Sequence, residues 1–405
     1  MPIPSSTSPH GQAEGSLPLR VLMMADTPAD PNRGAAGTEV QTIDALRRLG
    51  HQVDALWSSH LGRRIAHGNL HLLLELPRAY ERAVVRSLHE KRYDVIHVNQ
   101  PQGYRAARAV HRLSPASVFI HRSHGFEPNV EETLKPWRAL YDCDNRHFLR
   151  RLSSRGLTSL VARHGRAIAR EADGHIVSSS LDAAFLNTVF DVALDRVAVI
   201  PQSAPESYLS GIPPAWEVQR LHRVLHVAQL AFFKAPMITA AAFNHLAEAD
   251  HQLRFTWVCD RSSESTVRSL LTPQANERME VLAWTEQNTL RDIYDAHGIF
   301  LFPSFFEGFG KAFLEAMSRG LCVIASDTGG MHDMIENGHD GVLVPLGDAK
   351  ALAEAALAII RNPERAAVMS ASAVATARRH TWDRVASETA EFYRARLTAR
   401  NAVRR

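Results

Sequence analysis

The chain has few cysteines, few lysines and no long apolar run. Only three cysteines occur among its 405 residues. They form no CxxC pair, so neither a disulfide framework nor a structural zinc site is indicated. No apolar stretch approaches the ~18 residues of a membrane span, and the first residues lack the basic-then-apolar order of a signal peptide. These absences predict a soluble, globular, cytoplasmic protein.

Positive charge is distributed unevenly along the chain. Residues 60–170 hold 20 basic against 9 acidic side chains, a net charge of +11, whereas residues 171–405 carry −6. Only five of the 46 basic residues are lysine. The basic region is open to three interpretations: an anionic membrane surface at the inner face of the membrane, a phosphorylated sugar, or an ordinary solvated helix face. No nucleic-acid partner is expected.

Short apolar segments alternate with helical stretches through both halves of the chain, which favours parallel sheets covered by helices on both faces. Strands are predicted at 19–24, 52–57, 94–98, 117–120, 174–178 and 197–201, and again at 224–227, 255–259, 279–282, 299–302, 321–325 and 342–344. The sequence therefore predicts two α/β domains.

The domain boundaries follow from breaks in this alternation. Residues 1–18 are predicted to form a flexible tail and residues 19–203 a first domain. Residues 204–221, rich in proline and glycine, form a linker, and residues 222–380 a second domain. A final helix within 381–405 has no strand after it. We expect that helix to pack back toward the first domain.

The densest chemical signal is a glycine loop that follows the predicted strand at 299–302. Gly308 and Gly310 allow close approach of the backbone to a ligand, and Glu307 and Glu315 are separated by seven residues. Loops and helix N-termini at the carboxyl ends of parallel strands favour phosphate. Carboxylates beside a phosphate site are unfavourable unless they accept hydrogen bonds from sugar hydroxyls. The pattern therefore favours a nucleotide sugar over a nucleotide phosphate alone.

Neighbouring loops add to this site. A second glycine pair, at 329–330, follows the next strand, and Lys234 follows the first strand of the second domain. On the first domain, His124 follows a predicted strand in a segment that also holds Arg122 and Glu127. The glycine loop at 34–39 ends in Gly37, Thr38 and Glu39, and Thr38 to Gln41 has the form of a capping box that begins a helix.

The run from Glu307 to Pro345 resembles the C-terminal signature of retaining family-four glycosyltransferases. It contains Glu-x7-Glu, the glycine pair at 329–330 and the Ile335-x-x-Gly338-x-x-Gly341 spacing. Similarity in the same order extends back to about residue 20. The resemblance implies the GT-B fold, in which two Rossmann-like parallel-sheet domains face each other across a cleft. It also implies transfer of a sugar from a nucleoside-diphosphate sugar, with retention and without a required metal or other cofactor, to a sugar, lipid-linked or small-molecule acceptor.

The resemblance also assigns roles to individual residues. Glu307, Lys234 and His124 are the expected catalytic group, with Lys234 at the diphosphate and Glu307 and His124 at the donor sugar. Glu315 would hold the ribose and Trp284 would lie by the base. The remaining expected donor-binding residues are Phe309, Gly310, Lys311, Gly330 and Gln229. The expected cleft loop of the first domain consists of Gly37, Thr38 and Glu39.

The sequence departs from the family pattern at two positions. Gln229 stands where an arginine is usual, and Gln202-Ser203 stands where a glycine is common. The first departure supports an alternative, a GT-B-like nucleotide-sugar binding protein or epimerase without transferase activity. A nicotinamide-dependent oxidoreductase is disfavoured because Phe313 occupies the third glycine of its fingerprint. The Asp142-Cys143-Asp144 triplet, which has a metal-binding form in another transferase fold, follows no clear strand and is interpreted as chance.

Overall fold

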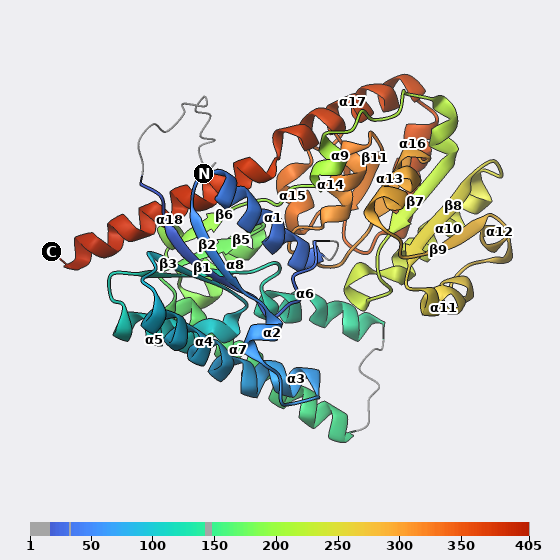
Figure 1. Ribbon diagram of the computed structural model, residues 1–405. Coiled ribbons are helices and arrows are strands. Elements are labelled where there is room, and N and C mark those ends of the chain that lie inside the picture. The colour runs from blue at the N-terminus through green and yellow to red at the C-terminus, as the bar shows by residue number, and fades with distance from the viewer. Residues whose placement is uncertain (1–16, 32–33, 142–147, 405) are drawn as a thin grey trace.

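The chain forms two α/β units, each built on a six-stranded parallel sheet, in the computed structural model shown in Figure 1. The structure describes residues 17–31, 34–141 and 148–404, and of residues 148–158 and 403–404 the backbone only. The Asp142–Asp144 triplet therefore lies outside the described residues, as do the side chains of the arginines between 146 and 155. We call the part that carries β1 to β6 the first unit and the part that carries β7 to β12 the second unit.

The first sheet has the strand order β2-β1-β3-β4-β5-β6, and all of its neighbouring strands pair in parallel. Its strands are almost wholly buried at the centre of the unit, as expected where helices cover both faces. They are β1 (Arg20–Met24), β2 (Gln52–Leu56), β3 (Val95–Asn99), β4 (Val118–Arg122), β5 (Gly174–Val177) and β6 (Val197–Val199).

The second sheet has the order β12-β11-β10-β7-β8-β9, again all parallel. The order reverses between β7 and β10, where Val224 lies opposite Ile299. Such a reversal leaves a crevice at the carboxyl ends of the two strands, where open α/β sheets bind ligands. The strands are β7 (Arg223–Val227), β8 (Arg254–Cys259), β9 (Met279–Ala283), β10 (Ile299–Phe302), β11 (Cys322–Ser326) and β12 (Val342–Val344).

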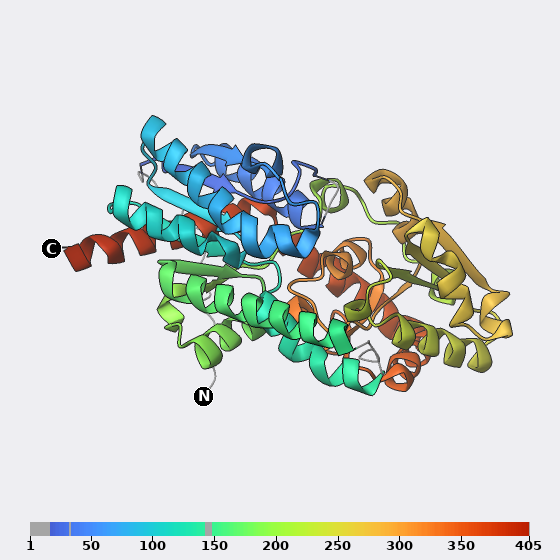
Figure 2. The same cartoon turned by 90° about the horizontal axis from the view of Figure 1, so that it is seen from below.

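Helices cover both faces of each sheet, as Figures 1 and 2 show. The helices of the first unit are α1 (Gly34–Arg48), α2 (Ser58–Leu61), α3 (Gly68–Leu70), α4 (Leu76–Glu90), α5 (Tyr104–Leu113), α6 (Glu127–Leu140), α7 (Phe148–Glu171) and α8 (Ser180–Phe190), with a π-helix η1 (His71–Glu75) and 3₁₀ turns η2 (Pro101–Gly103) and η3 (Leu194–Arg196). The later helices are α9 (Glu206–Leu209), α10 (Pro236–Ala249), α11 (Glu264–Ser269), α12 (Pro273–Asn276), α13 (Gln287–Asp295), α14 (Lys311–Ser318), α15 (Gly329–Met334), α16 (Ala349–Ile360), α17 (Pro363–Arg379) and α18 (Trp382–Arg404), with 3₁₀ turns η4 (Val218–His222), η5 (Phe232–Lys234) and η6 (Arg261–Ser263).

All twelve predicted strands are present, with ends within two residues of the prediction. The prediction of a loop through Gly37, with a helix from Thr38, is wrong, because α1 already includes Gly34. Thr38 is not an N-cap: its hydroxyl oxygen lies 3.1 Å from the carbonyl oxygen of Gly34, one turn earlier in the helix. The two glycines misled the interpretation, and Gly37 is needed inside the helix because a Cβ there would lie 2.4 Å from the carbonyl oxygen of Pro31.

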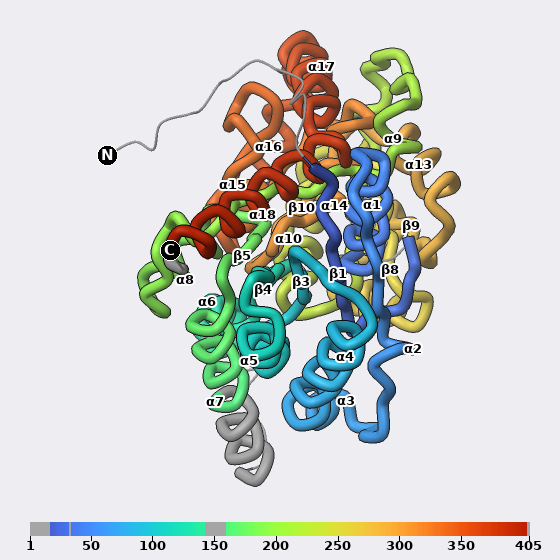
Figure 3. The backbone as a smooth tube through the Cα atoms, turned by 60° about the vertical axis from the view of Figure 1, so that its left-hand side comes forward, coloured from blue at the N-terminus to red at the C-terminus, as the bar shows by residue number. Residues whose placement is uncertain are grey.

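The last helix, α18, returns to the first unit and lies beside α1 on one face of the first sheet, as Figure 3 shows. Its Trp382, Val385, Ala386 and Tyr393 are buried in one cluster with the side chains of β1 and β4 that lie on this face of the sheet. The chain therefore crosses between the units twice, near residues 204 and 380. The indole of Trp382 donates to the carbonyl of Ala204, 3.0 Å away, and ties the two crossings together.

None of the described helices combines the length and the apolar character needed to cross a bilayer.

Candidate functional site

A pocket of about 930 Å³ lies between the two units, within the ~300–1,000 Å³ usual for small-molecule sites. The second unit supplies most of its wall, from the loops after β7 and β10 where the strand order reverses. The first unit supplies Gly34, Ala35, His124 and Gln202. The carboxyl ends of both sheets therefore meet at one cavity.

Lys234 and Glu307 face each other inside this pocket. The Nζ atom of Lys234 lies 2.5 Å from Oε1 of Glu307, and both side chains are largely buried. The same carboxylate oxygen accepts a hydrogen bond from the Ser304 hydroxyl at 2.6 Å. The ammonium also lies 5.0 Å from the centre of the Phe302 ring. A buried ion pair of this kind supplies one cation and one carboxylate on the same wall of the pocket.

The loop between β10 and α14 brings backbone from both units into close contact. A Cβ on Gly308 would lie 1.7 Å from the carbonyl oxygen of His124, so only glycine permits this approach. Gly310 has φ of +91° and is the N-cap of α14. Gly330 packs against Phe309 in turn, since a Cβ there would lie 2.5 Å from its ring. The loop conformation thus depends on glycine at positions 308 and 310, and its packing on α15 depends on glycine at position 330.

Glu315 lies one turn into α14, beside Lys311, and both line the pocket. The hydroxyl of Tyr294 donates to Oε2 of Glu315 at 3.2 Å. Burial raises the pKa of Glu315, and the charge of Lys311 and the Tyr294 hydrogen bond offset part of that rise. Burial likewise lowers the pKa of Lys311. A carboxylate in this setting gains from polar partners such as sugar hydroxyls.

The opposite end of the pocket is more open. Trp284 is 45% exposed there and Gln229 is also exposed. Asp260, Thr285 and Gln287 complete this end. An exposed indole beside polar side chains provides a flat apolar surface on which a planar ring can stack.

On the first unit, His124 is held by two protein partners. Its Nε2 atom lies 2.6 Å from Oε1 of Glu39, and its Nδ1 lies 3.2 Å from the Gln202 amide nitrogen. Burial would raise the pKa of Glu39, but the hydrogen bond and charge of His124, together with the charge of Arg122, lower it to about 2. Ionised Glu39 can only accept, so Nε2 of His124 carries the proton and Nδ1 accepts from Gln202. The imidazole is thereby fixed in orientation.

Most of the predicted site residues meet at the pocket. Its wall includes His124, Gln229, Lys234, Trp284, Glu307, Phe309, Gly310, Lys311 and Glu315. Gly37, Thr38, Glu39 and Gly330 do not line it. Glu39 acts on the pocket through His124, and Thr38 donates at 2.8 Å to the side chain of Gln202.

Gly34 and Ala35, which line the pocket, belong to the glycine loop expected at 34–39. Four other lining residues were not predicted as site residues: Gln202, Asp260, Thr285 and Gln287. Gln202 had a sequence signal, because it departs from the family pattern, but the sequence does not bring it next to His124. Asp260 follows β8 at the same carboxyl edge as Lys234, a position that could have indicated it.

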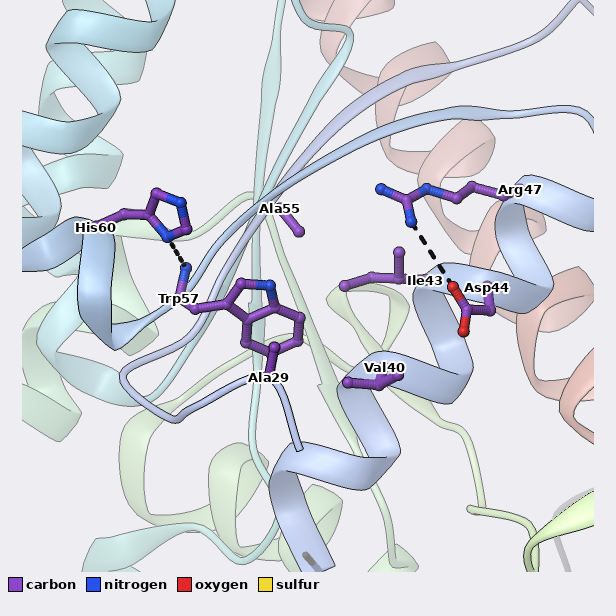
Figure 4. A pocket seen from close by; sticks show the side chains of 8 residues that line it. All are labelled: Ala29, Val40, Ile43, Asp44, Arg47, Ala55, Trp57 and His60. Atoms are coloured by element: carbon purple, nitrogen blue, oxygen red, sulfur yellow. Dashed lines mark hydrogen bonds and ion pairs between the residues drawn. The ribbon is translucent and has the colours of Figure 1, made fainter. Parts of the chain in front are cut away.

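A second, smaller pocket of about 370 Å³ lies between α1 and the edge strand β2 (Figure 4). Its walls are mostly apolar, with Val40, Ile43 and Trp57 facing the cavity. Nδ1 of His60 accepts from the backbone N–H of Trp57 at 3.0 Å. None of the predicted site residues lines it.

Two glycosyltransferase family models match the chain. The model described as Glycosyltransferase Family 4 matches residues 34–204, and the model described as Glycosyl transferases group 1 matches residues 222–362. The two matches fall on the first and second units in turn and together span most of the chain.

Curated proteins similar to this chain are also named as glycosyltransferases. The D-inositol 3-phosphate glycosyltransferase of Xylanimonas cellulosilytica is 28% identical over 262 residues, which cover 59% of this chain and 62% of that protein. The enzyme of the same name from Streptomyces griseus is 28% identical over 60% of this chain and 56% of its own length. The match thus spans less than two thirds of these relatives.

Solved structures share the fold. Sucrose-phosphate synthase from Thermosynechococcus elongatus superposes with a TM-score of 0.73 at 21% identity, covering 94% of this chain and all of that one. Anabaena HepE in complex with UDP gives 0.64 at 18% identity, covering 92% and 99%. At these low sequence identities, the superpositions show a shared fold and nothing about the reaction. With both family models matched in order and two parallel-sheet units facing a shared pocket, the chain belongs to the family-four glycosyltransferases of GT-B fold.

Proposed function

We propose that this protein transfers a sugar from a nucleoside-diphosphate sugar to an acceptor hydroxyl, with retention at the anomeric carbon and without a metal. The observation that carries the proposal is the Lys234–Glu307 pair, which shares one interdomain pocket with Glu315 and the N-terminus of α14. A diphosphate needs a cation and N–H donors, and a sugar needs carboxylates that accept from its hydroxyls. This pocket offers both.

In the proposed reaction each residue acts on a different part of the donor. Lys234 and the N-terminus of α14 stabilise the charge that develops on the diphosphate as the bond to the sugar breaks. Glu307 accepts hydrogen bonds from the sugar hydroxyls and Glu315 from the ribose. The acceptor's proton passes to the departing phosphate oxygen, so no protein base is required. Because Lys234 and Glu307 pair with each other, donor binding must share or replace that contact.

The acceptor enters from the first unit in this proposal, beside His124. The curated relatives are named for a phosphorylated cyclitol, which makes inositol phosphates the first acceptors to test. HepE was solved with UDP-glucose, which makes that compound the first donor to test. A sugar or a lipid-linked alcohol is the next acceptor class. The proposed location is the cytoplasm.

Turnover and binding of site variants test the assignment. Lys234→Ala and Glu307→Gln are expected to lower turnover by about 10²–10³-fold, the usual loss when transition-state charge stabilisation is removed. Glu315→Gln is expected to weaken UDP binding by about tenfold, as for one charged hydrogen bond. Lys350→Ala removes an exposed lysine of the second unit and is the matched control.

The measurements are release of nucleoside diphosphate with and without acceptor, the anomeric configuration of the product by NMR, and donor affinity by calorimetry. Wild-type turnover in both Lys234→Ala and Glu307→Gln would overturn the site assignment. Donor binding without transfer to any acceptor class would favour the nucleotide-sugar binding protein instead. Loss of turnover on addition of a chelator would overturn metal independence.

A further inference from the structure

A basic groove lies on the face of the first unit opposite α1 and α18. The helices α4, α5 and α7 lie side by side there, as Figure 2 shows from below. Between them is a cavity of about 370 Å³, and four of the eleven residues that line it are arginines: Arg78, Arg105, Arg108 and Arg163. None of its residues belongs to the donor pocket. We propose that this groove binds a phosphate group.

The charge of the groove is only partly neutralised by the protein. Arg105 pairs with Glu81 at 2.7 Å and Arg108 with Glu171 at 3.1 Å. Among the described residues, neither Arg78 nor Arg163 has a carboxylate partner within ion-pair distance, and both are exposed. Two uncompensated guanidinium groups therefore face one concave site. Guanidinium groups match the geometry of phosphate oxygens and bind them by paired N–H donors.

A buried histidine at the groove also lacks a partner. His164 is only 6% exposed, and its Nδ1 atom is buried without a hydrogen-bond partner among the described residues. Its ring lies 5.1 Å from that of Tyr104, which in turn has the Arg108 guanidinium 5.5 Å above it. A buried polar atom without a partner is rare in folded proteins, and a bound ion or water is its usual explanation. An anion at the groove would order this stack and supply the missing polar surroundings.

Arg105 lies in the first turn of α5, where the positive end of that helix adds to its charge. Arg78 lies inside a continuous helical segment, because η1 runs directly into α4. The rim is apolar, with Leu74 47% exposed. Two ligands share the required chemistry: a soluble phosphate ester, and the phosphate of a lipid headgroup whose tails would lie along this rim.

Binding of phosphate probes tests the groove. The probes are inorganic phosphate, glycerol 3-phosphate, and vesicles of phosphatidylcholine with or without phosphatidylglycerol. The variant Arg78→Gln with Arg163→Gln removes the two unpaired charges. The variant Arg112→Gln with Arg166→Gln removes two exposed charges from α5 and α7 outside the groove and is the matched control. Affinity should fall at least tenfold in the first variant and by less than twofold in the second.

The possible outcomes distinguish a soluble phosphate ester from a lipid headgroup, and they include results that would overturn the proposal. Binding of the soluble probes assigns the groove to a phosphate ester, and binding of the anionic vesicles alone assigns it to a lipid headgroup. An equal loss in both variants would reveal general surface charge and overturn the proposal, as would no binding of any probe at millimolar concentration. Arg163→Gln alone removes an exposed, unpaired side chain and keeps the test available if the double variant does not fold. UDP affinity reports separately on the donor pocket, so failure here leaves the proposed function untouched.

Discussion

Glu127 is a carboxyl group held where its charge is costly. It is the first residue of α6, and its Oε2 atom is buried without a hydrogen-bond partner among the described residues. Burial raises the pKa of Glu127 from 4.5 to about 7, the backbone N–H of the same residue offsets part of the rise, and the charge of Asp182 adds to it. Near neutral pH this side chain is therefore poised between its two protonation states.

The expected consequence is a stability that falls as pH rises. A carboxyl group whose pKa is higher in the folded chain binds more protons there than in the unfolded chain between pH ~4.5 and ~7. The destabilisation of the folded chain by the buried Glu127 charge is therefore absent below that pH window and fully present above it. Glu127→Gln removes the charge, so it should raise the melting temperature at pH 8 and have a much smaller effect at pH 5. Thermal unfolding of both proteins across this range checks it, and an equal shift at both pH values would contradict it.

The loop between β10 and α14 carries Glu307, which we propose to be catalytic, and also contacts the first unit. Gly308 meets the His124 carbonyl so closely that no side chain fits between them. His124 in turn is fixed by Glu39 and Gln202. The loop that carries Glu307 is therefore in direct backbone contact with the first unit in the described arrangement.

Gly308→Ala should therefore separate donor binding from turnover. The added methyl group forces the loop away from His124, and a displacement of about 1 Å at a reacting centre can cost ~10²-fold in rate. UDP affinity should change little, because most of the donor pocket belongs to the second unit. Turnover and UDP affinity measured together check this. Gly68→Ala is the control, since its Cβ would meet only the end of Arg63 at 4.0 Å. Unchanged turnover in Gly308→Ala would mean that the contact is not needed.

Elements buried on both faces could be predicted from the sequence, whereas contacts distant in the chain could not. Each strand is a short apolar run, because its side chains pack against helices on either side. The start of α1 was missed because glycines at 34 and 37 are typical of a loop, although Gly37 lies inside the helix and packs closely on Pro31. The bond between Thr38 and Gln202 spans 164 residues, and no local pattern encodes it. Lys234 and Glu307 could be assigned to one site in advance, because both follow strands at one sheet edge, but their ion pair was not predicted.

At the scale of the whole molecule, two contacts outside the pocket hold the units together. Trp137 of α6 reaches the second unit and stacks on Phe305, with ring centres 4.4 Å apart and planes 12° apart. A Cβ on Gly347 would lie 2.4 Å from the same indole, so the ring fills a fitted recess. Elsewhere, the backbone N–H of Ser180 on α8 donates to Asp333 of α15 at 2.7 Å. The described arrangement is therefore a closed one.

Removing both contacts should shift the molecule toward a more open arrangement. Trp137→Ala with Asp333→Ala deletes the stacked indole and the carboxylate, while both cores remain intact. The radius of gyration from small-angle scattering should increase, and a bound donor should reverse part of the increase. Leu140→Ala with Asp292→Ala changes exposed side chains on the same units and is the control. An unchanged scattering curve in the double variant would show that other contacts determine closure.

The return of α18 determines which parts of this chain can be exchanged with those of another transferase. The hydroxyl of Tyr393 contacts Nδ1 of His97 at 2.5 Å in the interior of the first unit, and Phe392 packs on Gly174. A hybrid enzyme that kept the first half of this chain but took everything after residue 204 from a relative would replace that interior surface with a foreign one. Donor preference can be transplanted cleanly only if the inserted piece ends before Trp382, so that the host keeps its own last helix.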